Sequence, residues 1–570
     1  MRLVQIASAG VLALGSSLAA AQGQFVQSPP LAQVVTTPVG AVAPGQIQVP
    51  IITWGGDIAT LYANGNAKQT ARSSIFGKLG LNLRLAREDV FAKQLDAYLA
   101  GRSPYLRGTL GMVHMAAEAA NRDPRTKPVV IYQLTWSAGG DALVVKSAIK
   151  TTRDLKGKTV AVQAYGPHVD YLSKILADAG LSPKDVTIRW TADLTGGAKS
   201  PAGALHDPKV DAALVIIPDA LALTSNGTVG TGAEDSVKGA RILLSTKTAN
   251  RIIADVYAVR SDYLQANRAE VEKFVLGLLQ GEEALRRLVA NSASRAAEYK
   301  ETMAAAAREL LDSAQAIADV EGMYKDANFV AVTGNAQFFT RAENPRGFAT
   351  LNKEIQQAFT ALGLAARASV LEHAQWDYRK LGAAPDVAAA PEASRFDKDR
   401  VASVVARRQS QGKLTEGELF SFEVLFKPNQ DKFPLELYSD AFKRVVGLAA
   451  TYGGAVVTVE GHSDPMGYLR AKKDGQPEVV LSRTQQSAKN LSLSRAIAVR
   501  DSLIAYAKSQ GISLDASQLA VVGHGITQPK SGMCGGDPCA PKTEAEWQSN
   551  MRVEFRIIQI EAEATAFKPL

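Results

Sequence analysis

Short apolar runs alternate with longer amphipathic stretches from residue 47 to residue 365. The runs KPVVIYQLTW (127–136) and GKTVAVQAYG (157–166) have the length of single strands, whereas apolar residues recur at helical spacing in EVEKFVLGLLQGEEALRRLV (270–289). Strands that are separated by helices favour a parallel α/β fold. Because the span is too long for one simple doubly wound sheet, we expect it to form two α/β lobes.

A change of composition after this span indicates a second domain. The stretch GAAPDVAAAPEAS (382–394) is rich in Ala and Pro, as linkers are, and it is followed by an expected helix at 397–409. Apolar runs and helical stretches then recur from Gly417 onward, which predicts a small α+β domain. The chain is therefore divided into a two-lobed domain (47–370), a linker (371–414), an α+β domain (415–560) and a C-terminal tail (561–570).

The first 21 residues have the pattern of a secretory signal peptide. Arg2 precedes a short apolar run that ends at Ala19-Ala20-Ala21, which predicts cleavage before Gln22. Residues 22–46, rich in Pro, Val, Gln and Gly, are expected to form a Pro-rich tail. A membrane anchor is the alternative, and the shortness of the run and its Gly and Ser residues disfavour it. We therefore expect the protein in the periplasm or cell envelope.

Cys534 and Cys539 are the two cysteines of the chain. Export implies an oxidising compartment, where a disulfide that closes this short loop is expected. A zinc pair is the alternative, but the sequence near them holds no second pair of thiolates or histidines that would complete a zinc site.

Motifs of the common enzyme classes are missing from the sequence. Gly157-Lys158-Thr159 is not part of a P-loop, because Thr152 stands where that loop needs a glycine. The GHG triplet at 523–525 lacks the later glycine of a dinucleotide loop, and no G-x-S-x-G or H-E-x-x-H motif occurs. The six histidines are dispersed, none paired at i,i+4. We therefore predict no enzymatic activity, no cofactor and no metal.

The charge of the chain is mildly basic, with a formal net charge of +8. Lys and Arg are scattered and form no run of the kind that binds nucleic acid, so we expect no nucleic-acid partner. A polyanionic envelope would suit this charge, although solubility alone explains it.

Several polar and glycine-containing loops follow the expected strands of the two-lobed domain. Ligands of parallel α/β sheets bind beyond the carboxyl ends of the strands, near helix N-termini. Each glycine taken alone would equally suit a plain tight turn, but their recurrence at successive strand ends favours a solute site. The residues predicted to line it are Trp54, Gly55, Gly56, Asp57, Thr109, Ser137, Tyr165 and Asp219. Two carboxylates, Asp57 and Asp219, against the single Arg107 favour a polar or cationic solute over a simple oxyanion.

Residues 151–190 carry a DLKGK turn, a strand, a loop, a helix and an AGL…DV entry to the next strand. Together with KVDAALVIIPDA (209–220) and ADVYAVRSDYLQANRAEVEKFV (254–275), they resemble the periplasmic solute-binding proteins of ABC importers, most of all the nitrate/sulfonate/taurine group. The resemblance covers roughly 300 residues. It implies a type II-like two-lobed periplasmic-binding-protein fold, a small-molecule solute and an ABC permease as a possible partner. We expect the lobes to be joined by 141–146 and 255–260.

The heptapeptide GHSDPMG (461–467) opens a second set of motifs. It is followed in order by Leu491-Ser492, Arg495-Ala496, Val499 and Leu503, then Gly523-His524-Gly525, and finally Arg552-Val553-Glu554. This ordered set resembles the OmpA-like peptidoglycan-binding domain. The resemblance implies that Asp464 binds the ammonium and Arg495 the carboxylate of the diamino acid in the peptide stem. His462 is expected to shape the strand end rather than to act as a ligand or base.

Two departures from the OmpA-like pattern concern this pocket. About sixteen extra residues, within 468–490, separate the aspartate from the arginine motif, and Ala488 stands where the family has an asparagine. The insertion could rim the pocket or block it, and the sequence leaves both open.

Two functions remain open from the sequence. The first is an exported solute-binding protein, the receptor of an ABC importer, that is tethered non-covalently to peptidoglycan. The alternative is a cell-wall-bound structural or sensory envelope protein with no transport role. An envelope enzyme is a third and disfavoured reading.

Overall fold

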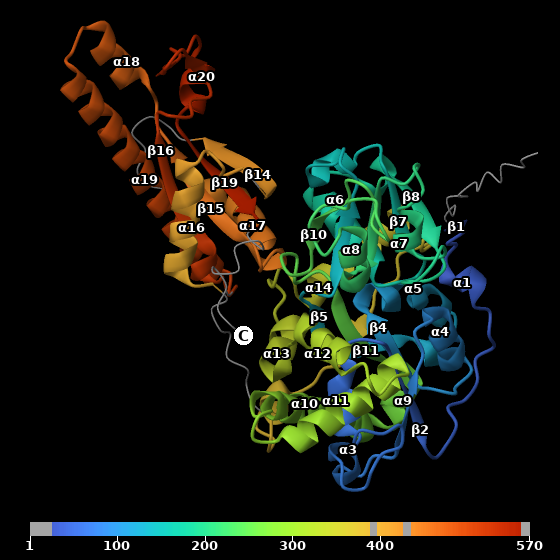
Figure 1. Ribbon diagram of the computed structural model, residues 1–570. Coiled ribbons are helices and arrows are strands. Elements are labelled where there is room, and N and C mark those ends of the chain that lie inside the picture. The colour runs from blue at the N-terminus through green and yellow to red at the C-terminus, as the bar shows by residue number, and fades with distance from the viewer. Residues whose placement is uncertain (1–24, 388–395, 416, 426–434, 513, 560–570) are drawn as a thin grey trace, which may run out of the picture.

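The computed structural model describes residues 25–387, 396–415, 417–425, 435–512 and 514–559. The predicted signal peptide and the tail at 561–570 lie outside the described residues. Figure 1 shows three bodies: lobe 1 in blue and yellow-green, lobe 2 in teal and green, and a C-terminal domain in orange and red. Within the described residues, no helix combines the length and apolar character needed to cross a bilayer.

Lobe 1 contains residues 47–137 and 254–387, and its main sheet has the strand order β12-β5-β11-β4. Its strands are β2 (Ile47–Ile51), β3 (Leu83–Arg87), β4 (Tyr105–Thr109), β5 (Pro128–Ser137), β11 (Ala254–Arg260), β12 (Ala327–Phe329) and β13 (Glu372–His373). Its helices are α2 (Asp57–Ala63), α3 (Ile75–Lys78), α4 (Phe91–Leu99), α5 (Leu110–Ala120), α9 (Ser261–Ala266), α10 (Arg268–Ala290), α11 (Ala296–Leu311), α12 (Ile317–Asp326), α13 (Ala331–Thr340), α14 (Phe348–Ala361) and α15 (Tyr378–Gly382). The long α10 packs on α2 and α3 and closes an aliphatic and aromatic core.

Lobe 2 contains residues 141–245 and has a sheet of order β1-β8-β7-β9-β6-β10. Its own strands are β6 (Asp141–Val145), β7 (Thr159–Gln163), β8 (Thr187–Thr191), β9 (Ala212–Ile216) and β10 (Arg241–Ser245), and its helices are α6 (His168–Asp178), α7 (Pro201–Ala204) and α8 (Ile217–Leu223). The central β7 is parallel to β8 and β9, as the alternation of strands and helices predicts. The two lobes expected from the sequence are thus present.

Two short connectors join the lobes, at residues 138–140 and 246–253. The sequence placed these joints at 141–146 and 255–260, but those segments are β6 and β11, each paired within one sheet. The physical reason is direction. The chain leaves lobe 1 through β5 and returns through β11, so β11 runs antiparallel to β5 and to β4, and the sheet is mixed rather than parallel.

The N-terminal arm, residues 25–46, touches both lobes. Its strand β1 (Phe25–Val26) pairs with β8 of lobe 2, and its helix α1 (Leu31–Val34) packs on α5 of lobe 1. Farther along, the N–H of Gly40 donates to the Leu99 carbonyl at 2.9 Å. The stretch expected as a Pro-rich tail is therefore a packed segment.

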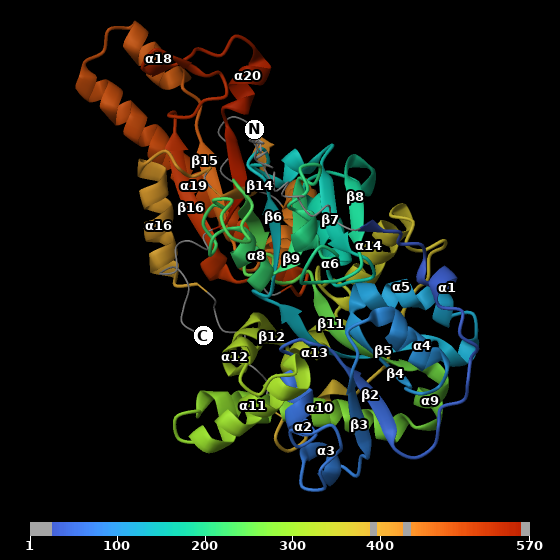
Figure 2. The ribbon, with the colours of Figure 1, turned by 45° about the vertical axis from the view of Figure 1, so that its right-hand side comes forward.

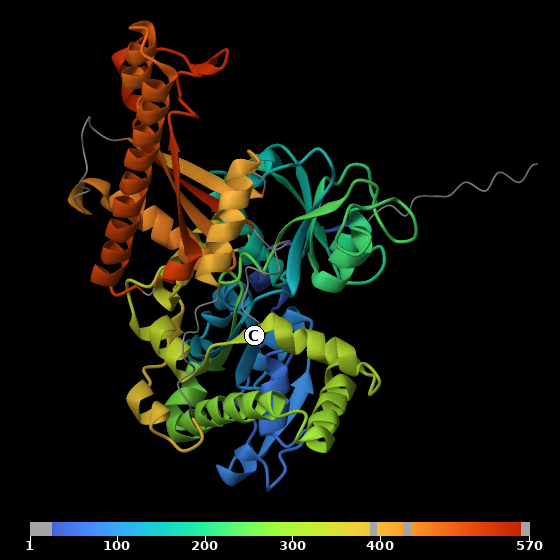
Figure 3. The ribbon, with the colours of Figure 1, turned by 60° about the vertical axis from the view of Figure 1, so that its left-hand side comes forward.

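The C-terminal domain has a four-stranded sheet of order β14-β19-β15-β16. Its elements are α16 (Lys398–Ser410), β14 (Glu418–Leu425), α17 (Leu435–Thr451), β15 (Val456–His462), α18 (Met466–Lys473), α19 (Glu478–Ser509), β16 (Leu519–Gly525), β17 (Met533–Cys534), β18 (Asp537–Pro538), α20 (Glu544–Ser549) and β19 (Arg552–Ile558). Apolar side chains alternate between the two faces of the sheet, and α17 and α19 cover one face while α16 covers the other (Figure 3). The helix expected at 397–409 is thus confirmed as α16.

The insertion between the Asp464 and Arg495 motifs is helical. It forms α18 and lengthens α19 at its N-terminus, and both project beyond the end of the sheet (Figures 1 and 2). Tyr468 on α18 donates to Asp537 Oδ1 at 2.8 Å, in the loop that the Cys534–Cys539 disulfide closes. The predicted disulfide is present, and it fixes the loop on which the insertion leans.

The C-terminal domain contacts the α/β half at the second connector. The N–H of Gly454 donates to the Thr248 carbonyl at 3.0 Å, and the Arg251 N–H donates to the Thr451 carbonyl at 3.3 Å. Beside them, the hydroxyl of the buried Tyr452 donates to Asp178 Oδ2 of lobe 2 at 2.8 Å. A side chain at position 454 has no room, because its Cβ would lie 1.9 Å from the Lys247 carbonyl oxygen.

We expect Gly454→Ala to separate the C-terminal domain from the connector, since the added methyl group meets backbone rather than a flexible side chain. Small-angle scattering should show a larger radius of gyration, with the fold retained by circular dichroism. Gly447→Ala is the matched control, because its Cβ meets nothing within 4 Å and the change in helix α17 should stabilise it by about 0.5–1 kcal/mol. Equal radii of gyration for the two variants would contradict the contact between the C-terminal domain and the second connector.

Candidate functional site

Trp54 lies where lobe 1 meets the first connector. Its indole N–H donates to Thr135 Oγ1 at 2.9 Å, which fixes the ring against the end of β5. The ring covers Gly140, where a Cβ would lie 2.6 Å from a ring carbon. The half-buried Trp54 therefore stands at the junction of the lobes, where the sequence predicted a wall of the solute site.

Arg107 on β4 is fully buried between two carboxylates. Its Nε and Nη2 donate to Asp57 at 3.2 and 2.8 Å, and its Nη1 donates to Asp255 Oδ1 at 2.9 Å. Burial raises the pKa of Asp57 to about 7, although Arg107 lowers it, and burial likewise raises the pKa of Asp255. The structure thus places Asp57 in an internal ion pair, beneath the junction surface.

A second polar cluster joins the connectors to lobe 2. The Ser137 hydroxyl donates to Asp141 Oδ2 at 2.6 Å and lies 3.0 Å from Thr246 Oγ1. The other oxygen of Asp141 lies 2.8 Å from Nε2 of His168, whose Nδ1 has no hydrogen-bond partner. This cluster gathers residues from β5, the second connector and the start of α6, so a change in the lobe angle would have to move it.

Asp170 crosses from lobe 2 to lobe 1. A Cβ on Gly111, in the first turn of α5, would lie 3.0 Å from its Oδ2, and the backbone N–H groups of Asp170 and Gly111 stabilise its ionised form. Burial raises the pKa of Asp170 to about 8, and the nearby Asp255 and Asp141 add to this. A carboxyl group is favourable at a helix N-terminus, so this side chain fills the position at α5 that an anionic ligand would otherwise take.

The other predicted site residues are spread over both lobes. Thr109 caps α5 by accepting the Met112 N–H at 3.1 Å, and Gly55 and Gly56 pack on α12 and Thr135. Asp219, in the first turn of α8, is half-buried near His168, and burial raises its pKa. Tyr165 donates to the Pro29 carbonyl at 2.6 Å and so holds the N-terminal arm. The structure brings Trp54 and Ser137 to the junction and ties Tyr165 to the arm.

Carboxyl groups outnumber cationic side chains among the described residues of the junction. Asp141, Asp170, Asp219 and Asp326 surround the connectors, against Lys247 and Lys325, and burial raises the pKa of Asp326 to about 6 although these two lysines lower it. The guanidinium of Arg107 is already engaged by Asp57 and Asp255. The junction therefore suits positive or polar neutral groups better than anions. Asp141, Asp170 and Thr246 were not predicted from the sequence, and only the place of Asp170 at the start of a predicted helix, beside the loop of Tyr165 and His168, could have pointed to one of them.

In the C-terminal domain, Asp464 follows β15 at the foot of α18. It is half-buried, its Oδ1 has no hydrogen-bond partner, and burial raises its pKa although the Trp547 side chain and the Met466 N–H lower it. Trp547 lies on α20, so an element that the sequence left unassigned shields this carboxylate.

Helix α19 brings Arg495 to the same end of the sheet. Gly461 packs on the carbonyl of Ser492, which a Cβ would approach to 2.0 Å, and the Ser463 hydroxyl donates to the Ala488 carbonyl at 2.9 Å. Ser492 Oγ in turn accepts the Gly525 N–H at 2.9 Å. Arg495 lies one turn beyond Ser492 and is buried, 6% exposed.

The buried Asp170 carboxyl should make the protein less stable as the pH rises. An unfolded aspartate has a pKa of about 3.9. Because the folded pKa is raised, to about 8, the stability is full below about pH 4 and is lost progressively up to about pH 8. Asp170→Asn, which cannot ionise, should therefore gain up to about 1.4 kcal/mol per pH unit relative to the wild type across this window, measured by urea unfolding. The exposed Asp235→Asn is the control, and a constant difference for Asp170→Asn between pH 5 and 8 would contradict the assignment.

Comparisons with known proteins concern the α/β half. A model of the family described as NMT1/THI5 like matches residues 127–287, which include lobe 2 and both connectors. A comparison with curated proteins finds no match. Among solved structures, the alkanesulfonate-binding protein SsuA from Xanthomonas axonopodis pv. citri, bound to MOPS, is 18% identical, with a TM-score of 0.39 over 59% of this chain and 100% of that chain. The periplasmic aliphatic sulphonate binding protein SsuA from Escherichia coli is 17% identical, with a TM-score of 0.39 over 59% and 94%. The periplasmic nitrate-binding protein NrtA from Synechocystis PCC 6803 is 13% identical, with a TM-score of 0.33 over 48% and 69%.

Proposed function

We propose that this chain is an exported solute-binding protein that is held non-covalently on peptidoglycan. Its lobes capture a small molecule at their junction, its C-terminal domain binds the peptide stem of the wall, and an ABC permease receives the solute. The observation that carries the proposal is a pair of lobes between which the chain crosses through two short connectors, at 138–140 and 246–253, with buried polar side chains of both lobes at the joint. The place of action is the periplasm or cell envelope.

The chemistry of the junction points to the class of solute. Asp170 already occupies the N-terminus of α5, and Asp219 has a buried oxygen, Oδ2, without a hydrogen-bond partner. A cationic or hydrogen-bond-donating solute satisfies such oxygens and favours their ionised form, whereas an oxyanion offers them no donor. The Trp54 ring supplies an apolar or cation–π surface beside them. This supports a polar or cationic solute.

The wall-binding part of the proposal rests on Asp464 and Arg495. The free Oδ1 of Asp464 can accept an ammonium proton, and a guanidinium can bind a carboxylate with two parallel hydrogen bonds. Both residues belong to the same end of the sheet, where α19 crosses β15. The zwitterionic end of a diamino acid offers this pair of charges. The projecting α18 leans on the disulfide loop and forms one side of the same end of the domain.

A sensory envelope protein is the second candidate. One observation favours it: the C-terminal domain docks on the connector 246–253, which has to move when the lobes close. Solute occupancy would then reach the wall-bound domain directly. A solute-dependent change of wall affinity with no uptake in a strain that lacks other carriers would select this role over transport.

Asp464→Asn should weaken binding of the full-length protein to purified peptidoglycan. The amide keeps the shape of the side chain but loses the charge that attracts an ammonium group, and loss of one partner of such a pair costs about 2–5 kcal/mol. Cosedimentation measures the affinity, and Arg495→Gln should lower it in the same way. Asp474→Asn, an exposed carboxylate at the end of α18, is the control. If both variants cosediment with peptidoglycan as the wild type does, Asp464 and Arg495 do not form the binding pocket.

A solute should be found by a thermal-shift screen of the full-length protein that includes amines, amidines and oxyanions. A solute at 100 times its dissociation constant stabilises the folded protein by about 2.7 kcal/mol. Asp219→Asn should lower the affinity for this solute about tenfold or more, whereas the exposed Asp235→Asn should leave the affinity unchanged. Tight binding of sulfonate, nitrate or phosphate that Asp219→Asn leaves unchanged would refute the cationic class.

A further inference from the structure

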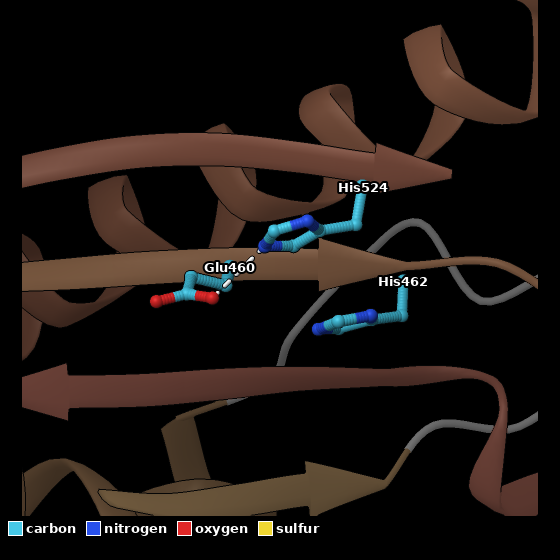
Figure 4. A group of neighbouring side chains, drawn as sticks. All are labelled: Glu460, His462 and His524. Carbon is cyan, nitrogen blue, oxygen red and sulfur yellow. Dashed lines mark hydrogen bonds and ion pairs between the residues drawn. The ribbon is translucent and has the colours of Figure 1, made fainter. Parts of the chain in front are cut away.

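Three side chains with metal-binding atoms converge on one face of the C-terminal sheet. Glu460 and His462 alternate along β15 and so point to the same side, and His524 comes from the neighbouring β16 (Figure 4). Their nearest ligand atoms all lie within 4.8 Å of one another, and the three side chains are at most 3% exposed. In Figure 4 the tips of both imidazole rings point along the strands toward Glu460.

His462 is the unexplained member of this group. It is 1% exposed, yet neither of its ring nitrogens has a hydrogen-bond partner. Its ring stacks on that of His524 with centroids 4.7 Å apart, a contact that satisfies no nitrogen. Leaving a buried polar group without a partner is unfavourable, so such a side chain calls for a ligand.

Hydrogen bonds hold Glu460 and His524, the other two members of the group, in place. Glu460 Oε2 lies 2.9 Å from His524 Nε2, while Oε1 accepts from Thr458 and from Arg556 Nε at 2.6 and 3.0 Å.

The charge balance admits a divalent cation. Arg556 is paired with Glu418, Glu460 and Glu554, and Arg552 and Lys530 are paired with Glu423 and Glu554. The four carboxylates exceed these three cations by one, so the site carries net negative charge when both histidines are neutral. Glu554 Oε1, 3.9 Å from His462 Nε2, is the nearest further oxygen.

We propose that Glu460, His462 and His524 form a zinc site. Two imidazole nitrogens and a carboxylate oxygen are a common ligand set for Zn²⁺, at about 2.0–2.2 Å from the ion, with the fourth position left to water or Glu554. The ligand atoms move together by about an ångström, and neutral His524 binds the metal through Nε2 with its one proton on Nδ1, so no imidazole proton has to be lost. The ion ties β15 to β16 on the α16 side of the sheet. Arg495 lies on α19, which covers the opposite face, so the proposal does not depend on wall binding.

The test is zinc binding to the full-length protein, purified without a histidine tag and stripped with a chelator. After zinc is added back and the excess is removed, mass spectrometry of the metal should find one zinc per chain, and a competing chromophoric chelator gives the affinity. His462→Gln and His524→Gln should each weaken binding about tenfold or more, since loss of an outer partner alone costs about 10–100-fold. His206→Gln, an exposed histidine of lobe 2, should bind as the wild type does.

Two results would overturn the proposal. One is wild-type protein that retains no stoichiometric zinc, and the other is unchanged affinity in both cluster variants. If a variant fails to fold, the wild-type protein is loaded with Co²⁺ in place of zinc and its visible absorption is measured. A spectrum of tetrahedral type supports the site, and an octahedral spectrum refutes it. Because none of these readouts involves peptidoglycan or solute, failure here leaves the proposed function untouched.

Discussion

The ion pairs of Arg107 hold lobe 1 together at the place where the chain departs for lobe 2 and comes back. Asp57 lies on α2, Arg107 on β4 and Asp255 on β11, so one guanidinium ties α2 to the returning strand β11. All three side chains are buried, at most 5% exposed. A buried ion pair adds little net stability, but loss of one partner costs about 3–5 kcal/mol. Its main effect here is therefore to fix where β11 enters the sheet, and with it the end of the second connector.

The junction built on this base is coupled to the rest of the molecule at three points. Ser137, Asp141 and Thr246 link the connectors to each other, and Asp170 links α6 to α5. Gly454 links the second connector to the C-terminal domain. A shift of the lobe angle has to disturb each of these contacts. Because packed interfaces have discrete arrangements rather than a continuous range, the lobes should exchange between a few states.

The pattern of apolar runs predicted the lobes, the order of elements in the C-terminal domain and the helix at 397–409. It did not predict the joints, because the direction of β11 depends on the return of the chain and not on local pattern. Asp57 was predicted to line the solute site, because the sequence does not show that Arg107, fifty residues away, pairs with it in the fold. For the same reason the approach of His524 to Glu460 was missed: spacing rules detect ligands on one helix, not on neighbouring strands.

The N-terminal arm crosses from one lobe to the other, through β1 on lobe 2 and α1 on lobe 1. It contributes to neither connector, yet it limits how far the lobes can swing apart. A single cut between α1 and β2 would therefore widen the accessible opening without altering any side chain at the junction. Capture and release of a ligand would change in rate while the contacts that choose the ligand stayed the same. The arm would thus influence how fast a ligand enters and leaves the junction, but not which ligand the junction selects.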